Sequence, residues 1–188
     1  MKLALVPAVA GIALATLSAC GGSAPSAQPS ATPTLPVVQP CDALDATAVS
    51  RALGQTVHVD KGSADSPACF LRPADPHGAA FDMNYQWFYV HGLAAYFRTA
   101  QLPAGKLSDV KIRGADAGKL IVNTSKNAYQ ITGYVQNGAL VQSVNGVGAA
   151  KDAPRILAAT KVILSQLSAG APAYLAKLGS ASPSPSAG

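Results

Sequence analysis

Glutamate is missing from this 188-residue sequence, and charged residues of all kinds make up only 12% of it. Without glutamate the chain cannot contain the HExxH motif of zinc proteases. It also lacks the GxSxG turn of serine hydrolases and the phosphate-binding loop of nucleotide hydrolases. Its basic residues are scattered, so the net charge of +5 favours solubility rather than nucleic-acid binding. We therefore expect a protein that is not an enzyme and that binds no nucleic acid.

The start of the chain has the layout of a signal peptide. Lys2 precedes an uncharged, mostly apolar stretch over 3–16, which is too short for a stable membrane span. The letters LSAC at 17–20 resemble the bacterial lipobox, whose cysteine receives a diacylglyceryl group. We expect residues 1–19 to be removed and Cys20 to anchor the mature protein outside the cell membrane through two or three acyl chains. The alternative is an ordinary signal peptide that leaves this cysteine free.

Two low-complexity segments flank one domain. Residues 20–40 are rich in Pro, Ser and Ala and carry no charge, which predicts an extended tether of up to about 60 Å. Residues 179–188 repeat this composition and are expected to be a disordered tail. The remaining residues, 41–178, are enough for a single core of ordinary size.

Cysteine is scarce, with three residues in the whole chain. With Cys20 lipidated, Cys41 and Cys69 are the only pair left in an oxidising compartment, so we predict a disulfide between them. Their spacing is not the Cys-x-x-Cys of a redox pair, and too few other ligands lie nearby for a metal site. The sequence thus gives no reason to expect a metal or another cofactor.

Residue patterns predict the elements of the first half of the domain. Asp42 or Asp45 can cap a short helix that stops at Gly54. Strands are expected at 55–60, 68–72 and 79–90, and a second helix at 92–100, followed by a loop. The strand at 79–90 alternates between an aromatic, apolar face and a polar face. The apolar face carries Phe81, Met83, Tyr85, Trp87 and Tyr89, and the polar face carries Asp82, Asn84 and Gln86.

The second half repeats the strand signal at 119–124, 128–136 and 139–145. Asn137-Gly138 predicts a hairpin with a type I′ turn. Gly146 and Gly148 are expected to end the last strand, and a terminal helix is expected to stop at Pro172. The order of elements predicts an α+β domain whose curved, mostly antiparallel sheet is packed with N-terminal, middle and C-terminal helices.

Three segments of this pattern carry a family resemblance. They are CDALDATAVSRALG at 41–54, SPACFLRP at 66–73 and PRILAATKVILSQL at 154–167, together with the strand rich in Trp and Tyr. They resemble small actinobacterial envelope lipoproteins, the domain-of-unknown-function families numbered 2020 and 3558. The resemblance implies the same disulfide and an α+β sandwich similar to the PsbP/Mog1-like architecture. It brings no catalytic residue, because those families have none established.

Aromatic residues are few, but six of them are candidates for ligand binding. They are Tyr85, Trp87, Tyr89, Tyr96, Tyr129 and Tyr134. Large apolar area combined with hydroxyl and indole donors suits a pocket for a lipid or a glycan. The alternative is that alternating aromatics simply form the buried face of a sheet.

Two further groups of residues contain side chains that could form a site. One is the set of histidines, at positions 58, 77 and 91, which are scattered and are expected on the solvated surface. The other is the basic run Lys106, Lys111, Arg113 and Lys119, which could touch anionic envelope polymers but suits a solvated loop equally well.

These observations lead to one expectation about function with two alternatives. We expect a monomeric, non-catalytic domain, lipid-anchored to the membrane, that binds a partner protein or a ligand outside the cell. The first alternative is a carrier or chaperone for a hydrophobic or glycan ligand, which a pocket above about 300 Å³ lined by the tyrosines would favour. The second is a hydrolase with a dispersed active site.

Overall fold

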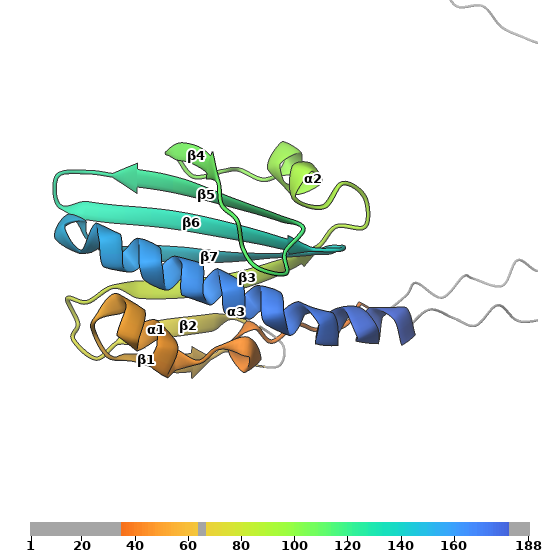
Figure 1. Ribbon diagram of the computed structural model, residues 1–188, viewed down its shortest axis with the longest axis horizontal. Coiled ribbons are helices and arrows are strands. Elements are labelled where there is room, and N and C mark those ends of the chain that lie inside the picture. The colour runs from red at the N-terminus through yellow and green to blue at the C-terminus, as the bar shows by residue number, and fades with distance from the viewer. Residues whose placement is uncertain (1–34, 64–66, 181–188) are drawn as a thin grey trace, which may run out of the picture. The chain divides into compact units, whose positions relative to one another are not determined.

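The computed structural model describes residues 35–63 and 67–180, in which seven antiparallel strands form one sheet (Figure 1). The strands are β1 (Val57–Lys61), β2 (Cys69–Pro73), β3 (Ala80–Trp87), β4 (Lys106–Asp109), β5 (Ala117–Thr124), β6 (Ala128–Asn137) and β7 (Leu140–Ala149). Their order across the sheet is β1-β2-β3-β7-β6-β5-β4. The chain thus builds one edge first, crosses to the other edge, and returns to the centre with β7. The predicted α+β class with a curved antiparallel sheet is confirmed.

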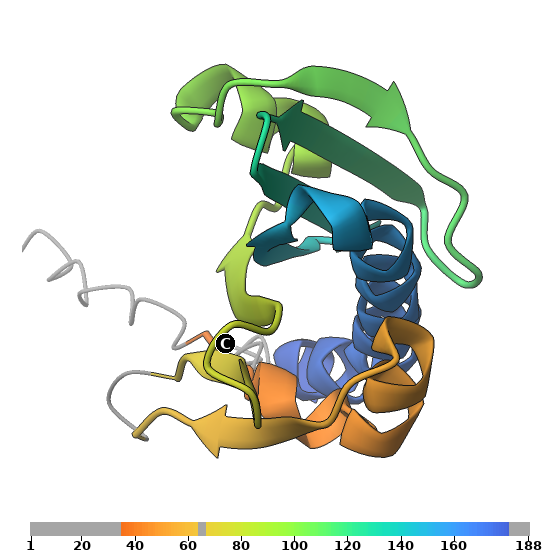
Figure 2. The same ribbon diagram turned by 90° about the vertical axis from the view of Figure 1, so that its left-hand side faces the viewer.

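Three α-helices accompany the sheet: α1 (Ala46–Leu53), α2 (Gly92–Thr99) and α3 (Ala153–Ser180). Short 3-10 turns, η1 (Pro40–Ala43) and η2 (Ala150–Asp152), precede α1 and α3. The sheet curls around α3, and α1 lies beside α3 on this same face, whereas α2 lies on the opposite face (Figures 1 and 2). We call the side covered by α3 the helix face and the other side the outer face.

The apolar stripe predicted for the last helix forms the centre of the core. Its members Ile156, Ala159, Ile163, Leu164 and Leu167 are fully buried. They pack against β6, β7 and α1. Among the described residues, α3 with its leading turn is the one segment with the length and hydropathy of a membrane span. Because its apolar stripe is buried against the sheet, α3 is a core helix of this domain.

The elements around the first cysteine form as the sequence predicts. The carboxylate of Asp45 caps α1 by accepting hydrogen bonds from the backbone N–H groups of Thr47 and Ala48. The helix ends at Gly54 in the left-handed conformation. The predicted disulfide joins Cys41 in η1 to Cys69 at the start of β2, and both residues are buried.

The hairpin between β6 and β7 is confirmed, but its predicted turn type is wrong. Asn137 pairs with Leu140, so the two loop residues are Gly138 and Ala139, and of these Gly138 alone has a positive φ, of 55°. Glycine at the first loop position is typical of a type II′ turn. Asn137 stays in the strand because its side-chain amide donates to the carbonyl of Gly114 and to the hydroxyl of Ser168.

Two predicted stops are not stops. β7 continues through Gly146 and Gly148 to Ala149, because these glycines give room to large neighbours. A Cβ at Gly146 would lie 2.8 Å from the ring of Phe81. α3 likewise continues through Pro172, whose ring is exposed to solvent.

The residues around Pro172 keep the helix against the sheet on both sides of the proline. The carbonyl of Leu167 accepts a hydrogen bond from the buried Gln142 amide. Ala171 and Tyr174 pack with Val38 and Leu140 in a second small core. The predicted loop after α2 also contains an element that the sequence reading missed, the short edge strand β4, all of whose residues are exposed.

Contacts of the domain begin before Cys41, inside the range that the sequence assigns to the tether. Val38 is fully buried, the carbonyl of Pro36 accepts from the indole of Trp87, and the carbonyl of Gln39 accepts from the hydroxyl of Tyr174. The signal peptide, Cys20 and the tail after residue 180 lie outside the described residues.

Candidate binding groove on the outer face of the sheet

Strand alternation places polar side chains side by side on the outer face. On β3, the residues that sequence analysis assigned to the wet face, Asp82, Asn84 and Gln86, point away from α3, because Phe81 and Met83 between them are buried in the core under it. The register extends these polar positions across the sheet, since Asn84 lies opposite Ser143 and Ser143 lies opposite Tyr134. The outer face therefore carries rows of hydroxyl and amide groups.

A neighbouring row contains the one carboxylate of this part of the face. Asp82 lies opposite Asn145, and Asn145 lies opposite Thr132. The Asp82 carboxylate accepts hydrogen bonds from the amide of Asn145 at 2.7 Å and from that of Asn84 at 3.3 Å. In these bonds each amide donates through its nitrogen, so its orientation is fixed and its oxygen points away from the carboxylate.

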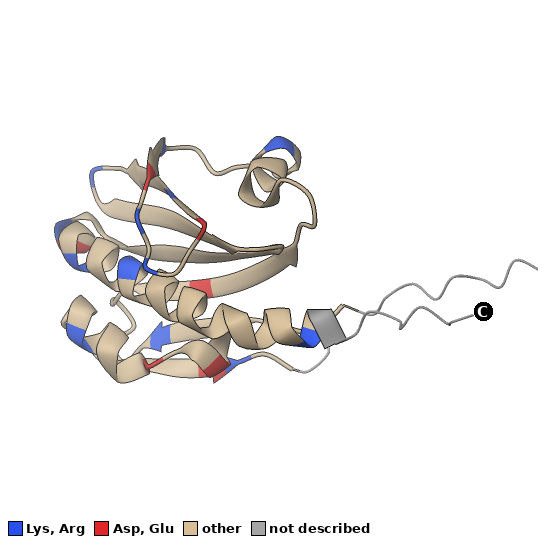
Figure 3. Cartoon of the chain, turned by 45° about the vertical axis from the view of Figure 1, so that its right-hand side comes forward, with Lys and Arg blue, Asp and Glu red and all other residues tan. Residues whose placement is uncertain are grey.

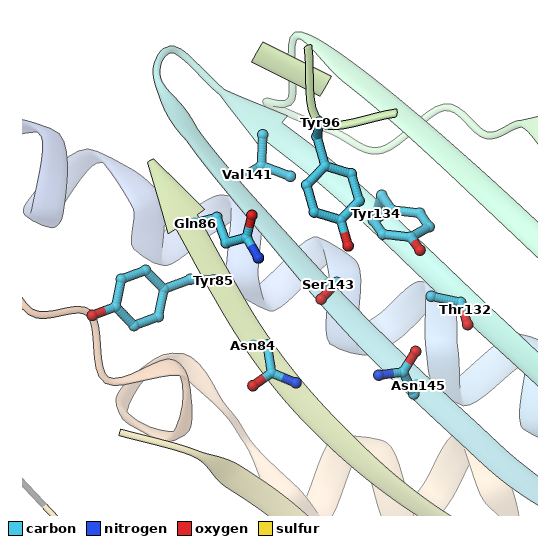
Figure 4. Close-up of a pocket in the computed structure, with 9 residues that line it drawn as sticks. All are labelled: Asn84, Tyr85, Gln86, Tyr96, Thr132, Tyr134, Val141, Ser143 and Asn145. Atoms are coloured by element: carbon cyan, nitrogen blue, oxygen red, sulfur yellow. The ribbon is translucent and has the colours of Figure 1, made fainter. Parts of the chain in front are cut away.

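α2 and the segment that follows it form a wall along one side of these rows. Leu93 of α2 packs on Ile121, Tyr134 and Val141 of the sheet. Between this wall and β3 lies a hollow of about 250 Å³ (Figure 4). Its lining comprises Asn84, Tyr85, Gln86, Tyr96, Thr132, Tyr134, Val141, Ser143 and Asn145. Figure 4 shows the hydroxyls of Tyr96 and Tyr134 directed toward the polar rows.

Two smaller hollows, of about 140 and 110 Å³, extend this depression along the outer face. The first shares Thr132 and Asn145 with the large hollow, and the second shares Asn123 and Gln130 with the first. We call the three together the outer groove. None of the residues that line it is charged or a histidine or cysteine. It therefore offers donors and acceptors of hydrogen bonds without the charges that ionic ligands require.

One end of the outer groove is aromatic. The ring of Tyr96 lies 5.3 Å from that of Tyr134, and Phe97 and Phe88 pack around the pair at 5.1 to 5.9 Å between ring centroids. Burial raises the pKa of the Tyr134 phenol well above its usual value, and the charge of Tyr96 and a hydrogen bond with it raise that pKa further. The Tyr134 phenol therefore stays protonated at neutral pH and can donate as well as accept.

The six aromatic candidates do not form one site. Tyr96 and Tyr134 lie in the outer groove, but Tyr85 borders it only near its backbone, because its ring points away (Figure 4). The rings of Tyr85 and Trp87 pack on the helix face beside Val38, Leu140 and Tyr174. Tyr129 is buried in the main core, where burial raises its pKa. Tyr89 lies beyond the end of β3 on an exposed connection rather than on the predicted strand.

The other candidates from the sequence do not line this groove, although Lys119 lies opposite the groove residue Tyr134 in the strand register. His58 and Asp60 share the exposed side of the edge strand β1, and Asp75 accepts from the backbone of His77 in a turn. In the basic run, Lys119 forms an ion pair with Asp109 on β4. Within residues 35–63 and 67–180, no three His, Cys or Asp side chains gather as metal ligands.

The sequence analysis named two groove residues, Tyr96 and Tyr134, as ligand candidates and placed Asn84 and Gln86 on a solvated face, but it missed the polar residues of β6 and β7. Thr132 and Asn145 alternate with apolar residues on β6 and β7, so strand alternation could have identified them, whereas Ser143 follows the polar but buried Gln142. The pairing of strands could not be predicted from alternation, because the paired strands β3 and β7 are distant in the chain. Searches of protein-family models, of curated proteins and of solved structures found no match to this chain.

Proposed function

We propose that this protein is a non-catalytic, lipid-anchored domain outside the cell membrane that binds an uncharged glycan in the outer groove. The observation that carries the proposal is the uncharged, polar lining of that groove, which includes the amides of Asn84, Gln86, Asn123, Gln130 and Asn145. Side-chain amides both donate and accept, which matches the hydroxyl groups of a sugar. The paired rings of Tyr96 and Tyr134 add the apolar area on which a sugar ring can pack.

The length of the outer groove also favours an extended ligand. Its hollows follow one another along β6 and β7, from the aromatic end to the turn at Ser125. An enclosed pocket for a drug-sized molecule needs about 300 Å³. The largest of the three hollows in the outer groove is smaller and mostly polar, so a hydrophobic ligand has less support than a chain of sugar units.

Catalysis has less support than binding. Glycoside hydrolysis uses two carboxyl groups flanking the bond that breaks. The Asp82 carboxylate lies beside the groove and accepts hydrogen bonds from two neutral amides, those of Asn84 and Asn145. The partner-protein version of the hypothesis needs a flat apolar surface, which the polar groove does not provide.

The test of binding uses neutral oligosaccharides as probes. Amide chemical shifts of the disulfide-bonded protein are followed while maltohexaose, mannohexaose or chitotetraose is added, with oligogalacturonate as the charged comparison. We expect shifts confined to β3, β6, β7 and α2 with at least one neutral sugar. Absence of such shifts with every neutral sugar, or a clear preference for the charged one, would overturn the assignment.

The variant for this test is Gln86→Ala combined with Ser143→Ala. Neither side chain forms a hydrogen bond with the described part of the chain, so the fold should be unaffected. Two lost ligand hydrogen bonds at about 1 kcal/mol each should weaken binding roughly thirtyfold. Gln166→Ala removes an amide on α3 across the molecule, whose hydrogen bonds go to the backbone of Asp45, and as the control it should leave the affinity unchanged.

The lipid anchor has its own test. Mass spectrometry of the N-terminal peptide of the mature protein should find Cys20 as the first residue with a diacylglyceryl thioether. Cys20→Ser should release the protein from the membrane fraction. An unmodified cysteine in protein taken from its native envelope would exclude the anchor while leaving the glycan proposal open.

A further inference from the structure

Four large apolar side chains are exposed at the end of the domain where the described chain begins. The exposed fractions are 39% for Leu35, 53% for Val37, 60% for Tyr89 and 64% for Val90. The indole of Trp87 donates a 3.2 Å hydrogen bond to the carbonyl of Pro36, which holds the two segments together. We call these four residues the tether-end tip.

The connection that carries Tyr89 and Val90 is fixed at both of its ends. The N–H of Phe88 donates to the carbonyl of Ala139 at 2.7 Å, and the N–H of Leu93 donates to the side chain of Gln136 at 2.8 Å. Between them His91 adopts a φ of 64°, which is costly for a residue other than glycine. The fold therefore presents Tyr89 and Val90 to solvent instead of folding them inward.

Charges of both signs lie near the tether-end tip, because the Asp116 carboxylate accepts from the N–H of Gly138 and the charge of Asp42 acts on Tyr174. Residues 35–41, 86–100 and 167–180 contain Arg98 and Lys177 and no aspartate. Arg98 lies in the last turn of α2 and Lys177 in the last turn of α3, and Figure 3 shows basic residues on both helices. Basic residues beside exposed aromatic and aliphatic side chains are typical of surfaces that rest on anionic membranes.

The position of the proposed anchor brings this end to the bilayer. Cys20 precedes Leu35 by 15 residues, which reach at most about 50 Å when fully extended. The opposite end of the domain lies farther away by about the 42 Å length of the 28-residue helix α3 (Figure 1). Because the segment from Cys20 joins the domain at Leu35, the tether-end tip needs the shortest length of this segment to reach a membrane that holds Cys20.

We propose that the tether-end tip inserts into the interface of the membrane that carries the lipid anchor, with Tyr89 and Val90 reaching the acyl chains. Arg98 and Lys177 then lie near anionic headgroups, and the long axis of the domain points away from the bilayer. The outer groove faces sideways in this position, open to polymers that run along the membrane. The inference goes beyond the proposed glycan binding and shares with it the anchoring at Cys20.

The experiment uses Trp87, the one tryptophan of the chain, as its probe. The mature protein from Cys20 onward keeps every described residue, and with the disulfide intact Cys20 has the one free thiol. This thiol is coupled to maleimide-phosphatidylethanolamine in vesicles of phosphatidylcholine and phosphatidylglycerol. Quenching of Trp87 fluorescence by phosphatidylcholine brominated on its acyl chains is then measured. Chemical coupling keeps the result independent of whether cells lipidate this cysteine.

We expect clear quenching in the unsubstituted protein and at least a threefold loss of quenching in Tyr89→Ser combined with Val90→Ser. The matched control is Leu107→Ser combined with Val147→Ser, two exposed apolar residues of β4 and β7 outside the tip, which should quench like the unsubstituted protein. Near-ultraviolet circular dichroism checks that both variants are folded, and Leu35→Ser with Val37→Ser supplies a second tip variant. Equal quenching in the tip variants and the unsubstituted protein, or none in any of them, would overturn the proposal.

Discussion

The hydroxyl of Tyr174, in the last part of α3, donates a 2.8 Å hydrogen bond to the backbone carbonyl of Gln39, 135 residues earlier in the chain. This bond and the burial of Val38 beside Ala171 attach the first described residues to the last helix. The start and the end of the domain therefore stabilise each other at the tether end.

The first prediction tests this bond with Tyr174→Phe. The substitution keeps the ring in the core and removes the donor, so the carbonyl of Gln39 loses its partner. We expect the free energy of unfolding to fall by about 0.5–1.5 kcal/mol. Urea unfolding followed by circular dichroism measures the change. No loss of stability would mean that solvent replaces the hydroxyl at this carbonyl without cost.

The second prediction concerns the disulfide. Cys41 and Cys69 are 28 residues apart, and joining them restricts the unfolded chain. Replacing both with serine should lower the free energy of unfolding by about 3–4 kcal/mol on the chain-entropy estimate. Urea unfolding of the variant and of the reduced protein should agree. A loss below 1 kcal/mol in both would show that the bond adds little to this fold.

The third prediction is a gain of stability. Pro172 lies inside α3 with its ring exposed, and it has no N–H for the carbonyl of Ser168. Pro172→Ala supplies that hydrogen bond and removes the clash of the ring, so the melting temperature should rise, with a gain of about 1–3 kcal/mol. Pro103→Ala, in an exposed loop, is the control and should change little. A decrease in the first variant would mean that the proline is needed for the packing of Tyr174.

The fourth prediction concerns the close contact of β7 with the core. A Cβ at Gly146 would lie 2.8 Å from the ring of Phe81 and 3.0 Å from a methyl group of Ile131. Gly146→Ala should therefore cost about 1–3 kcal/mol through overpacking. Val147→Ala, at the exposed neighbouring position, should lower the free energy of unfolding by less than about 1 kcal/mol, because surface substitutions usually have small effects. Thermal unfolding of the two variants gives the comparison.

The fifth prediction is a loss of stability in alkaline solution. Burial raises the pKa of Tyr129, Tyr134 and Tyr174 above the usual value of 10.0. The folded protein holds these protons more tightly than the unfolded chain, so their contribution is complete below pH 10 and is lost as the pH rises above it. Urea unfolding should show a constant free energy at neutral pH and a decrease from about pH 10 upward. Tyr134→Phe should make this decrease shallower, and an unchanged slope would contradict the role of that phenol.

Local patterns predicted most of the fold. Alternation in β3, the Asp45 cap and the stripe of α3 each depend on residues close together in the chain, and each appears in the structure. The extent of β7 and of α3 was not predicted, because it depends on distant residues. Gly146 is tolerated in a strand because Phe81 fills its space, and Pro172 is tolerated because the helix around it is held by Gln142 and Tyr174.

The candidate site was predicted less well, for a related reason. The sequence makes large aromatic side chains candidates for ligand binding, but Trp87 and Tyr129 pack in the core on the helix face. The polar residues on the other face of the sheet line the outer groove. In a single strand, however, alternating Asp and Asn residues indicate only that this face is exposed to water. The groove depends on two features of the tertiary structure. The strand register places Asn84 beside Ser143, and α2 packs over Tyr134 as one wall.

The central position of β7 also sets the order in which this domain can assemble. β3 pairs with β7 over its whole length, and the partners Asp82 and Asn145 are 63 residues apart. Until β7 is available, β3 has an unpaired edge, and Phe81 and Met83 still lack the later helix α3 that covers them. The chain can therefore complete its sheet only after about three quarters of it is available for folding. The incomplete β1–β3 meander leaves this edge and these apolar side chains open to aggregation.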